Sequence, residues 1–498
     1  MILAIDIGSS SLRAAVFTAA GDLLPDTLAR RPIAPTTTDD GGMTYNPAAL
    51  FAHLTQVVSR TLRLAARYGG SLSGVGVSTM MHSLMGVRLT PDGTADVGGP
   101  TTPVFAWGDT RSETEREHWA TSFAARRLYA RTGCPLHSSY WLLKLSWLKR
   151  RLNLAEWRWM SFAEYAWLRL FGVAYTSVSL ASATGLYSRR DADWDEEILA
   201  DLGLTKHHLP PVADDDFALA GDQLRPPFRN RWSPLRQAKF FPPLADGACG
   251  NLGSLCFTDT RAAVNIGTTA ALRITVPTDR EPEAPPPGLW AYRLDRRRAL
   301  IGGALSNAGN LLAWARRTLR LPPPAALEAA TSAARPDDTG LTVLPFWAGE
   351  RSLGWRSHAV GAIIGLRLAT DAVALWRALL ETLAVRLAWI ADELEAAGLL
   401  PATTPCVASG GVLASVAFAT ILCHALGRPL CVIPTETSAR GAALWVSLRL
   451  GLITADRCRP PDGQWFQPDA AAHARYRACL RRHRAAADTL FGGSTAHP

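Results

Sequence analysis

The chain has 498 residues, of which 48% are hydrophobic and 19% charged, and its formal net charge at pH 7 is +9. This length is too great for one hydrophobic core and suits two domains, while the apolar content excludes a disordered chain. The charge does not indicate a nucleic-acid binder, because the basic runs at 295–298 and 481–484 carry no interleaved aromatic residues and suit solvated faces. A basic protein does suit an anionic substrate.

Eight cysteines occur without any Cys-x-x-Cys pair, so their spacing fits no zinc site and favours reduced thiols. The N-terminus enters an apolar strand pattern with no charged segment before it, which predicts no signal peptide. No run of about 18 apolar residues predicts a membrane-spanning helix. We therefore expect a cytoplasmic protein that binds neither membranes nor nucleic acids.

The first half of the chain opens with two strand patterns, MILAIDIG (1–8) and LRAAVFT (12–18), around a turn of small residues. Helical spacing follows at 47–68, with an Asn-Pro start signal, and a short buried strand is predicted at 73–79. Further on, the pattern predicts a strand that runs into a polar turn at 103–112 and helices at 113–131 and 141–152.

A second domain-like pattern begins near residue 246. RAAVNIGTTAALRITV (261–276) repeats the opening design of an apolar strand, a glycine with hydroxyl residues, and a second apolar strand. Alternating strands and helices predict an α/β fold, and two copies of this unit predict two similar domains with a boundary between about 235 and 255. Long helices are predicted at 306–319, 371–398 and 412–427.

Two glycine-hydroxyl turns are candidate phosphate cradles, Gly8-Ser9-Ser10-Ser11 and Gly267-Thr268-Thr269. Glycine allows close backbone approach, and successive backbone N–H groups in such turns form concave anion sites. Neither turn is a Walker A loop, and each alone also fits an ordinary hairpin. Because the two turns lie in the two half-chains, they could hold two ends of one polyphosphate.

Two charged residues flank the first turn, and a third glycine site lies far along the chain. Asp6 could hold Mg²⁺ through water, since Mg²⁺ uses few carboxylates, or could only form the turn. Arg13 could pair with a phosphate oxygen or lie on a strand surface. Gly410-Gly411 precede a long apolar helix and could let a flat ligand lie on the backbone, or form a simple strand–helix turn. The segment 302–314 has a similar build.

Taken together, the motifs resemble those of the FGGY carbohydrate kinase family, over essentially the whole chain and in the family's order. The segments that carry the resemblance are AIDIGSSSLR (4–13), VSTMMHSL (77–84), FAWGDTRS (105–112), DGACGNLGS (246–254), VNIGTTAALR (264–273), LPFWAGERSLGWR (344–356), SGGVLAS (409–415) and TETSARGAAL (435–444).

The resemblance implies an α/β fold of two actin/hexokinase/Hsp70-like (ribonuclease H-like) domains that flank a central cleft. Residues 1–245 would form the N-terminal domain, with the sugar side and the first phosphate turn. Residues 246–498 would form the C-terminal domain, with the catalytic aspartate, the second phosphate turn and the adenosine site. The family includes many dimers, so a homodimer is consistent with it.

The resemblance also implies transfer of a phosphoryl group from ATP, with Mg²⁺, to a sugar hydroxyl. Asp246 would be the general base; without the resemblance it would be interpreted as a helix N-cap. The implied sugar contacts are Met81, His82, Trp107, Asp109 and Arg111. The implied nucleotide contacts are Gly8, Ser9, Ser10, Arg13, Gly267, Thr268, Gly309, Gly411 and Ser415, and the implied metal ligand is Asp6.

Within the family, MHSL, WGDTRS and DGACGNLG are most similar to bacterial gluconokinases, and Arg111 could hold the carboxylate of gluconate. A core role for His82, a turn salt bridge between Asp109 and Arg111, and packing of Trp107 are the structural alternatives. The departures from the family pattern are Met80, Leu353, Arg356 and His424. The alternative functions are a xylulokinase or another pentulose or polyol kinase, a non-catalytic sugar sensor and an actin-like assembling protein.

Overall fold

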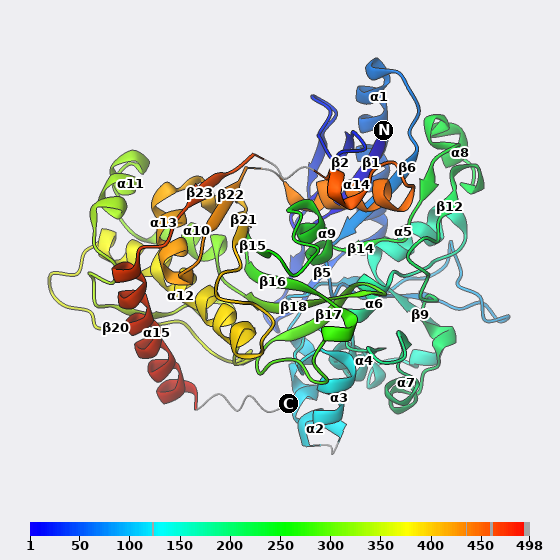
Figure 1. The fold of residues 1–498 in the computed structure, drawn as a ribbon. Coiled ribbons are helices and arrows are strands. Elements are labelled where there is room, and N and C mark those ends of the chain that lie inside the picture. The colour runs from blue at the N-terminus through cyan, green and yellow to red at the C-terminus, as the bar shows by residue number, and fades with distance from the viewer. Residues whose placement is uncertain (122–123, 435, 459–461, 493–498) are drawn as a thin grey trace. The chain divides into compact units, whose positions relative to one another are not determined.

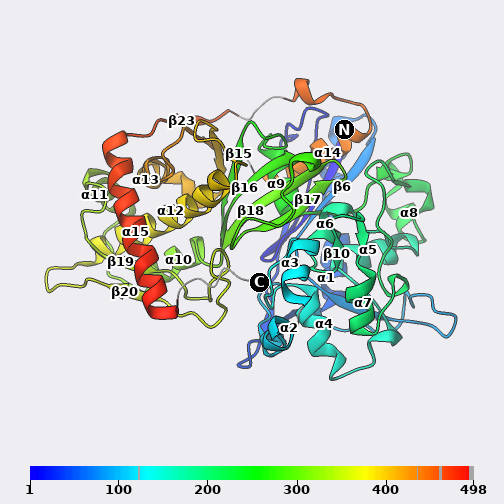
Figure 2. The same cartoon turned by 60° about the horizontal axis from the view of Figure 1, so that its bottom comes forward.

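The fold is taken from a computed structural model that describes residues 1–498 apart from 122–123, 435, 459–461 and 493–498 (Figures 1 and 2). Thr435, in one of the family-like segments, therefore lies outside the described residues. The chain divides into two compact units. The first unit contains Met1–Leu255, Tyr292–Ala299 and Thr437–Arg459, and the second contains Cys256–Ala291, Leu300–Glu436 and Pro460–Pro498.

A seven-stranded sheet forms the centre of the first unit. Its order is β12-β13-β6-β1-β2-β3, and β14 also pairs with β6. β1 is parallel to β6, and β6 is parallel to β14, whereas β1 and β2 form an antiparallel hairpin. The strands are β1 Ile2–Ile7, β2 Ser11–Phe17, β3 Ala29–Pro32, β6 Gly74–Thr79, β12 Leu219–Ala220, β13 Lys239–Phe240 and β14 Leu244–Ala245.

The two faces of this sheet differ in character. Leu3, Ile5 and Ile7 belong to an apolar core with α1 (Pro47–Ala65), whose N-cap Asn46 accepts a hydrogen bond from the Ala49 N–H. Successive strand residues point to opposite faces, so Asp6 lies on the other face. That face is covered by α9 (Asp246–Gly253) and α14 (Thr437–Arg449), which Figures 1 and 2 both show beside β6.

Small residues allow α9 and α14 to pack with their backbones in close contact. A Cβ at Gly253 would lie 1.9 Å from the Thr437 carbonyl oxygen, and one at Gly441 would lie 1.8 Å from the Cys249 carbonyl oxygen. A Cβ at Gly76 of β6 would lie 2.3 Å from the Ala442 carbonyl oxygen. This packing places α9 and α14 in the first compact unit, so the units differ from the predicted division of the chain after residue 245.

The other elements of the first unit surround this sheet. A three-stranded sheet contains β4 Thr36–Thr37, β5 Met43–Tyr45 and β8 Val104–Phe105, and two strand pairs contain β7 Met85–Arg88 with β9 Trp157–Met160 and β10 Tyr187–Ser188 with β11 Asp193–Trp194. The remaining helices are α2 Arg116–Thr121, α3 Ala124–Thr132, α4 Trp141–Lys149, α5 Phe162–Phe171, α6 Val178–Ser182, α7 Glu196–Leu202 and α8 Phe228–Arg231.

A second seven-stranded sheet has the order β17-β18-β16-β15-β21-β22-β23. Its strands are β15 Ala262–Ile266, β16 Ala270–Pro277, β17 Trp290–Asp295, β18 Arg298–Leu305, β21 Cys406–Ser409, β22 Leu430–Ile433 and β23 Gln464–Phe466. The second unit also contains the pair β19 Thr342–Leu344 with β20 Ala362–Ile364. Its helices are α10 Gly309–Thr318, α11 Pro324–Ala333, α12 Ala372–Ala396, α13 Val416–Leu426 and α15 Ala470–Phe491.

The structure confirms the predicted hairpins and most helices, and it differs from the prediction in two segments. Of the helix predicted at 113–131, the described residues form a 3₁₀ turn at Arg111–Glu115, followed by α2 and α3. The strand predicted within 103–112 is only the two-residue β8. All eight cysteines are buried free thiols. Over the described residues, no helix is long and apolar enough to cross a membrane.

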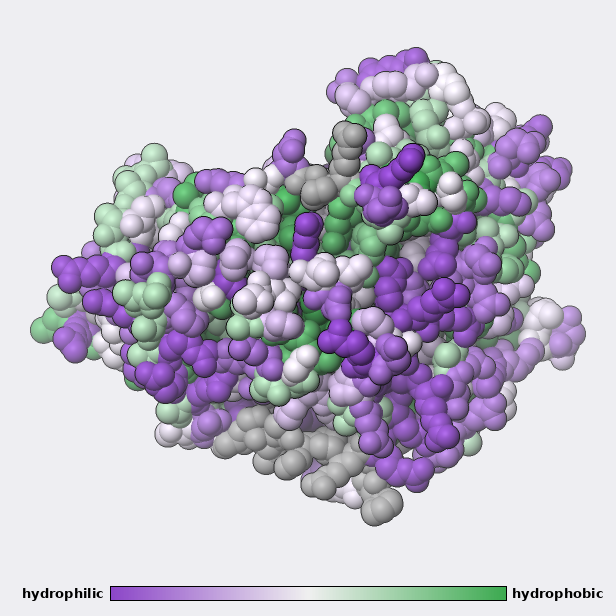
Figure 3. Space-filling model, in the orientation of Figure 1, coloured by the Kyte–Doolittle hydropathy of each residue, from purple (hydrophilic) through white to green (hydrophobic). Residues whose placement is uncertain are grey.

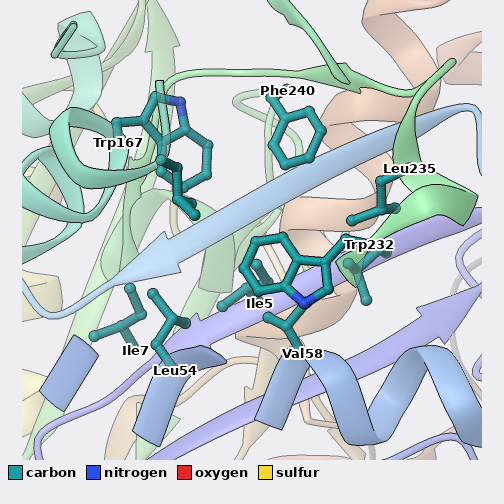
Figure 4. A pocket seen from close by; sticks show the side chains of 10 residues that line it. Ile5, Ile7, Leu54, Val58, Trp167, Trp232, Leu235 and Phe240 are labelled. Atoms are coloured by element: carbon teal, nitrogen blue, oxygen red, sulfur yellow. The ribbon is translucent and has the colours of Figure 1, made fainter. Parts of the chain in front are cut away.

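The interior of the first unit contains a small apolar cavity of about 10 Å³ (Figure 4). Its lining includes Ile5, Leu54, Trp167, Trp232 and Phe240. This volume is close to that of one water probe, and the apolar lining offers no hydrogen bond, so the cavity is a packing gap. On the face shown in Figure 3, hydrophilic residues are interspersed with smaller apolar patches, which is ordinary for the surface of folded domains.

Candidate active site

Three neighbouring parallel strands end at one edge of the first sheet, and each carries a polar residue there. Asp6 of β1 pairs in register with Ser78 of β6, and Leu244 of β14 pairs with the same Ser78. Asp246 follows β14 directly. The carboxyl ends of parallel strands are the usual position of ligand sites in α/β sheets. The backbone therefore brings together two of the predicted site residues, Asp6 and Asp246, which are 240 positions apart in the sequence.

Asp246 is the first residue of α9, and Ala245 occupies the N-cap position. The capping role that the sequence offered as an alternative for Asp246 is therefore not the one observed. Gly247 follows it, and this helix turn is built from small residues.

The thiol of Cys249 lies beside this edge. Burial raises the pKa of Cys249 well above its ordinary value, a hydrogen bond with Ser78 lowers it, and the charges of Asp6 and Asp246 raise it further. Both carboxylates therefore act on the same thiol, as expected for residues at neighbouring strand ends. No sequence pattern singled out Cys249, because a single cysteine in a small-residue helix suggests only packing.

Arg13 faces Asp6 across the β1–β2 hairpin. The two residues are directly opposite in the ladder, and Arg13 Nε lies 3.4 Å from Asp6 Oδ2. The Asp6 side chain is 5% exposed and that of Arg13 is 22% exposed. The guanidinium thus orients the carboxylate. Whether Arg13 also contacts a phosphate stays a prediction.

The turn between β1 and β2 is closed by its own backbone. The Gly8 N–H donates to the Ser11 carbonyl oxygen at 3.1 Å. Tyr45 Oη donates to the Ser9 carbonyl oxygen at 2.6 Å, and burial raises the pKa of Tyr45 to about 12, so the phenol keeps its proton. Ser10 is exposed and Gly8 and Ser9 are half-buried, so the predicted phosphate cradle reaches the surface.

His82 is the centre of a second cluster in the first unit. It is 6% exposed and has φ of +64°, a left-handed conformation that is uncommon for a residue with a side chain. Its Nδ1 lies 2.7 Å from the Ala183 carbonyl oxygen. The rings of Tyr140 and Tyr292 pack edge-on against it at 4.9 Å and 6.1 Å, and their hydroxyl groups are 2.6 Å apart.

Asp109 and Arg111 form a bidentate pair. Arg111 Nε donates to Asp109 Oδ1 at 3.0 Å, and Arg111 Nη2 donates to Oδ2 at 2.6 Å. The Met43 N–H donates to the same Oδ2, and the guanidinium lies over the Trp147 ring at 4.9 Å. The hydrogen bonds with Asp109 raise the pKa of Arg111. Because the forked edge of Arg111 is already bound to Asp109, that edge does not face a substrate carboxylate.

Met81 and Trp107, the other predicted sugar contacts, lie next to these residues in the chain. Met81 precedes His82, and Trp107 follows β8 two residues before Asp109. Both side chains are half-buried. Their contact with a sugar stays a prediction.

Buried Lys144 contacts the His82 segment and is a residue that sequence reasoning missed. It lies in α4 and is 2% exposed, and its Nζ donates to the carbonyl oxygens of His82, at 3.2 Å, and Ser139. A usable signal was present, because the chain has only four lysines and this one interrupts the apolar stretch WLLKLSWL. Tyr140 and Tyr292 offered no such signal.

In the second unit, the predicted nucleotide residues meet through backbone atoms. The Gly309 N–H donates to the Gly267 carbonyl oxygen at 2.9 Å, and the Asn310 N–H donates to the Thr268 carbonyl oxygen at 3.2 Å. A Cβ at Gly309 would lie 2.5 Å from the Gly267 carbonyl oxygen. The start of α10 therefore rests on the turn between β15 and β16.

Gly410 and Gly411 adjoin the same turn and differ from each other. Gly410 has φ of +123°, and a Cβ there would lie 2.1 Å from the Ile266 carbonyl oxygen. A Cβ at Gly411 would meet no atom within 4 Å, and the same holds for Gly267. Gly410 is thus required by the fold, whereas Gly267 and Gly411 border open space that a ligand could enter.

Ser415 has a structural role in the same region. It is the N-cap of α13, accepting from the Phe418 N–H at 3.1 Å, and its Oγ donates to Glu328 Oε2 at 2.7 Å. Glu328 also accepts from the Ala417 N–H at 2.8 Å. The predicted contact between Ser415 and a nucleotide is not tested by this arrangement.

Comparison with known proteins gives matches to both halves of the chain. The model of the FGGY family of carbohydrate kinases matches with its N-terminal domain at residues 1–218 and with its C-terminal domain at residues 262–448. The gluconokinase of Bacillus subtilis (strain 168) is 27% identical over 396 residues, covering 76% of this chain and 74% of its own. The glycerol kinase of Rhizorhabdus wittichii is 28% identical over 469 residues, covering 90% of this chain and 88% of its own.

Solved structures give a closer match in fold than in sequence. A ligand-bound xylulose kinase from Lactobacillus acidophilus superposes with a TM-score of 0.89, covers 99% of both chains and is 22% identical. At this identity the likeness concerns the fold alone. It confirms the predicted α/β class with two actin/hexokinase/Hsp70-like domains.

Proposed function

We propose that this chain, which belongs to the FGGY family of carbohydrate kinases because the models of both family domains match it, is a gluconate kinase. In the proposed reaction it transfers the γ-phosphoryl group of ATP to a hydroxyl group of gluconate. The predicted family is confirmed, and activity as a carbohydrate kinase follows from it. The choice of gluconate is supported by the motifs MHSL and WGDTRS and by the similarity to a gluconokinase. A cytoplasmic location and a homodimer stay predictions.

The observation that carries the proposed chemistry is the position of Asp246 at the same sheet edge as Asp6. In the proposed reaction, Asp246 accepts the proton of the attacking hydroxyl group. The hydroxyl oxygen bonds to the γ-phosphorus, and the bond from that phosphorus to the bridging oxygen of ADP breaks. Gly247, directly after Asp246, carries no side chain that could block the approach of a sugar.

Asp6 fits the role of a carboxylate near Mg²⁺. No group of three or more His, Cys, Asp or Glu side chains forms a metal site in the part of the chain that the structure describes, and Mg²⁺ needs only one or two carboxylates. Asp6 supplies one, at the strand edge where the hydroxyl-rich turn begins. When bound, Mg²⁺ would offset phosphate charge. Arg13 would keep the Asp6 carboxylate in place.

The Asp109–Arg111 pair favours a second candidate substrate class. The forked edge of Arg111 is bound to Asp109, so it is not available to a substrate carboxylate. The carboxylate oxygens of Asp109 can still accept further hydrogen bonds, which suits sugar hydroxyl groups. A neutral pentulose or polyol would then be the substrate. The similarity to a xylulose kinase and a glycerol kinase supports this candidate.

A coupled ADP-release assay tests both candidates with purified protein, Mg-ATP and a panel of gluconate, xylulose, ribulose, glycerol, fuculose and no sugar. Gluconate turnover that disappears in Asp246→Ala but persists in Asp222→Ala, a control at an exposed aspartate, would support the proposal. Turnover on a neutral sugar alone would favour the second candidate. ATP binding without turnover on any sugar would favour the sensor interpretation.

A further inference from the structure

Lys144 is an unusual cation within the first unit. Its side chain is buried, and its Nζ is held by two carbonyl oxygens, those of His82 and Ser139. Among the described residues it forms no ion pair. Burial lowers the pKa of Lys144 to about 7, although the nearby charge of Asp109 acts in the opposite direction. Burying an ammonium group is costly, so packing alone does not account for a lysine in this place.

The His82 end of this contact is a strained backbone. His82 has φ of +64°, and such conformations persist in non-glycine residues only where the surroundings hold them. Two contacts hold this residue, one at its backbone carbonyl group and one at its ring. Lys144 binds its carbonyl oxygen, and the Ala183 carbonyl oxygen binds its ring Nδ1. A neutral ring bound in this way carries its proton on Nδ1, which makes Nε2 the accepting nitrogen.

The Ser139 end of the contact fixes a second segment. Ser139 directly precedes Tyr140, and its N–H and hydroxyl group both lie within hydrogen-bond distance of His137 Nδ1, at 3.1 Å and 2.9 Å. The Tyr140 ring packs edge-on against His82 at 4.9 Å. The Lys144 ammonium group thus connects the backbones of the two segments that carry His82 and Tyr140, whose rings are in contact.

We propose that Lys144 is a positioning residue of the sugar pocket, which sets the affinity for the sugar by fixing the backbones of His82 and Ser139 without contacting the sugar itself. This inference rests on the proposed function, because it takes His82 as a sugar contact. Lysine suits the task since its ammonium group offers three donors from one atom, enough for two carbonyl oxygens in different segments. Methionine would fill the space and donate no hydrogen bond.

The chain offers a matched control on the same helix. Lys149, the last residue of α4, also donates from Nζ to a backbone carbonyl oxygen, that of Asp201 at 2.9 Å, but it is exposed. Lys144→Met and Lys149→Met therefore remove the same group from a buried and an exposed position of one helix. For the sugar that the wild-type enzyme phosphorylates, we expect Lys144→Met to raise KM about tenfold, as for loss of a hydrogen bond from a charged donor.

The kinetic pattern separates positioning from a purely structural role. Positioning predicts that Lys144→Met leaves the KM for ATP and kcat nearly unchanged and that Lys149→Met changes none of the three constants. An unchanged sugar KM in folded Lys144→Met protein would overturn the inference. If no sugar is phosphorylated, the proposed function fails, and calorimetric affinity for the same sugars replaces KM as the test of Lys144. Equal affinities in wild type and Lys144→Met would then overturn it.

A second measurement applies even if Lys144→Met does not fold. With lysine labelled at the ε-carbon, the wild-type protein should give four lysine signals in an NMR titration. We expect one signal to titrate near neutral pH, as burial implies for Lys144, and to shift when saturating sugar is added. Four signals that all titrate as free lysine would show that no lysine occupies the buried carbonyl site, and the inference would be wrong.

Discussion

The strand-end cluster of the first unit and the glycine turn of the second unit use different parts of the polypeptide. Asp6, Asp246 and Cys249 meet through side chains whose charges influence one another. Gly267 and Gly309 meet through an N–H and a carbonyl oxygen, with no side chain between them. A side-chain site changes its chemistry when one residue is replaced, whereas a backbone site is disrupted where an added side chain would meet another backbone atom, as at Gly309.

The largest expected effect lies in the side-chain site. Asp246→Asn keeps the shape of the residue and removes the proton acceptor, so kcat should fall by about 10²–10⁴-fold. The KM for ATP should change little, because the glycine turn is untouched. Steady-state kinetics on the active sugar checks this, with Asp222→Ala as the control. A kcat within a few-fold of wild type would remove Asp246 as the base.

The next effect tests the backbone site with two adjacent glycines. Gly410→Ala forces a left-handed residue against the Ile266 carbonyl oxygen and should destabilise the protein by about 3 kcal/mol. Gly411→Ala meets no atom and should leave stability unchanged while raising the KM for ATP, since the open space there is the predicted nucleotide contact. Denaturant unfolding and ATP kinetics measure both. Equal ATP kinetics in wild type and Gly411→Ala would refute the contact.

An intermediate effect concerns the choice between the two substrate classes. Arg111→Ala removes a bidentate hydrogen bond to Asp109, which contributes about 1.5–3 kcal/mol. If Asp109 binds hydroxyl groups, the KM for every accepted sugar should rise by up to the factor that this free energy represents, about 10- to 150-fold. A rise confined to gluconate would show that Arg111 binds its carboxylate, contrary to the pairing observed. The panel of sugars used for the wild type serves as the comparison.

The smallest expected effect is at Ser415. Ser415→Ala removes the N-cap of α13 and should cost about 1 kcal/mol of unfolding free energy. Because its hydroxyl group is bound to Glu328 and the Phe418 N–H, we expect no change in the KM for ATP. A higher KM for ATP at unchanged stability would instead support the predicted contact between Ser415 and the nucleotide. The nucleotide site of the second unit would then include a side chain as well as backbone groups.

The sequence predicted the fold, and it singled out Asp6 and Asp246 of the candidate site, where residue type carries the information. The strand–turn–strand units were visible because apolar runs flank Gly8 and Gly267. The segment 113–131 was predicted as one helix, but its first residues belong to a 3₁₀ turn that ends at Glu115, and helical spacing does not distinguish the two kinds of turn. The sequence could not distinguish a salt bridge between Arg111 and Asp109 from contacts of both residues with a substrate, since both interpretations need the same residues at the same spacing.

The contacts that depend on tertiary structure were beyond sequence reasoning. The placement of α9 and α14 in the first unit follows from backbone contact at Gly253 and Gly441, and a glycine in the sequence does not reveal its partner. The carbonyl oxygens bound by Lys144 belong to His82, 62 positions before it, and to the nearby Ser139. Carbonyl groups are present in every residue, so no pattern of residue types identifies them.

The burial of all eight free cysteines makes the chain a reporter of its own unfolding. Burial raises the thiol pKa of seven of them, so few thiolates exist in the folded protein at neutral pH. Alkylating reagents should therefore modify only molecules that have opened. Cys134 and Cys249 belong to the first unit and Cys406 and Cys423 to the second, so mass spectrometry of the alkylated peptides would time the opening of each unit separately, without an added label.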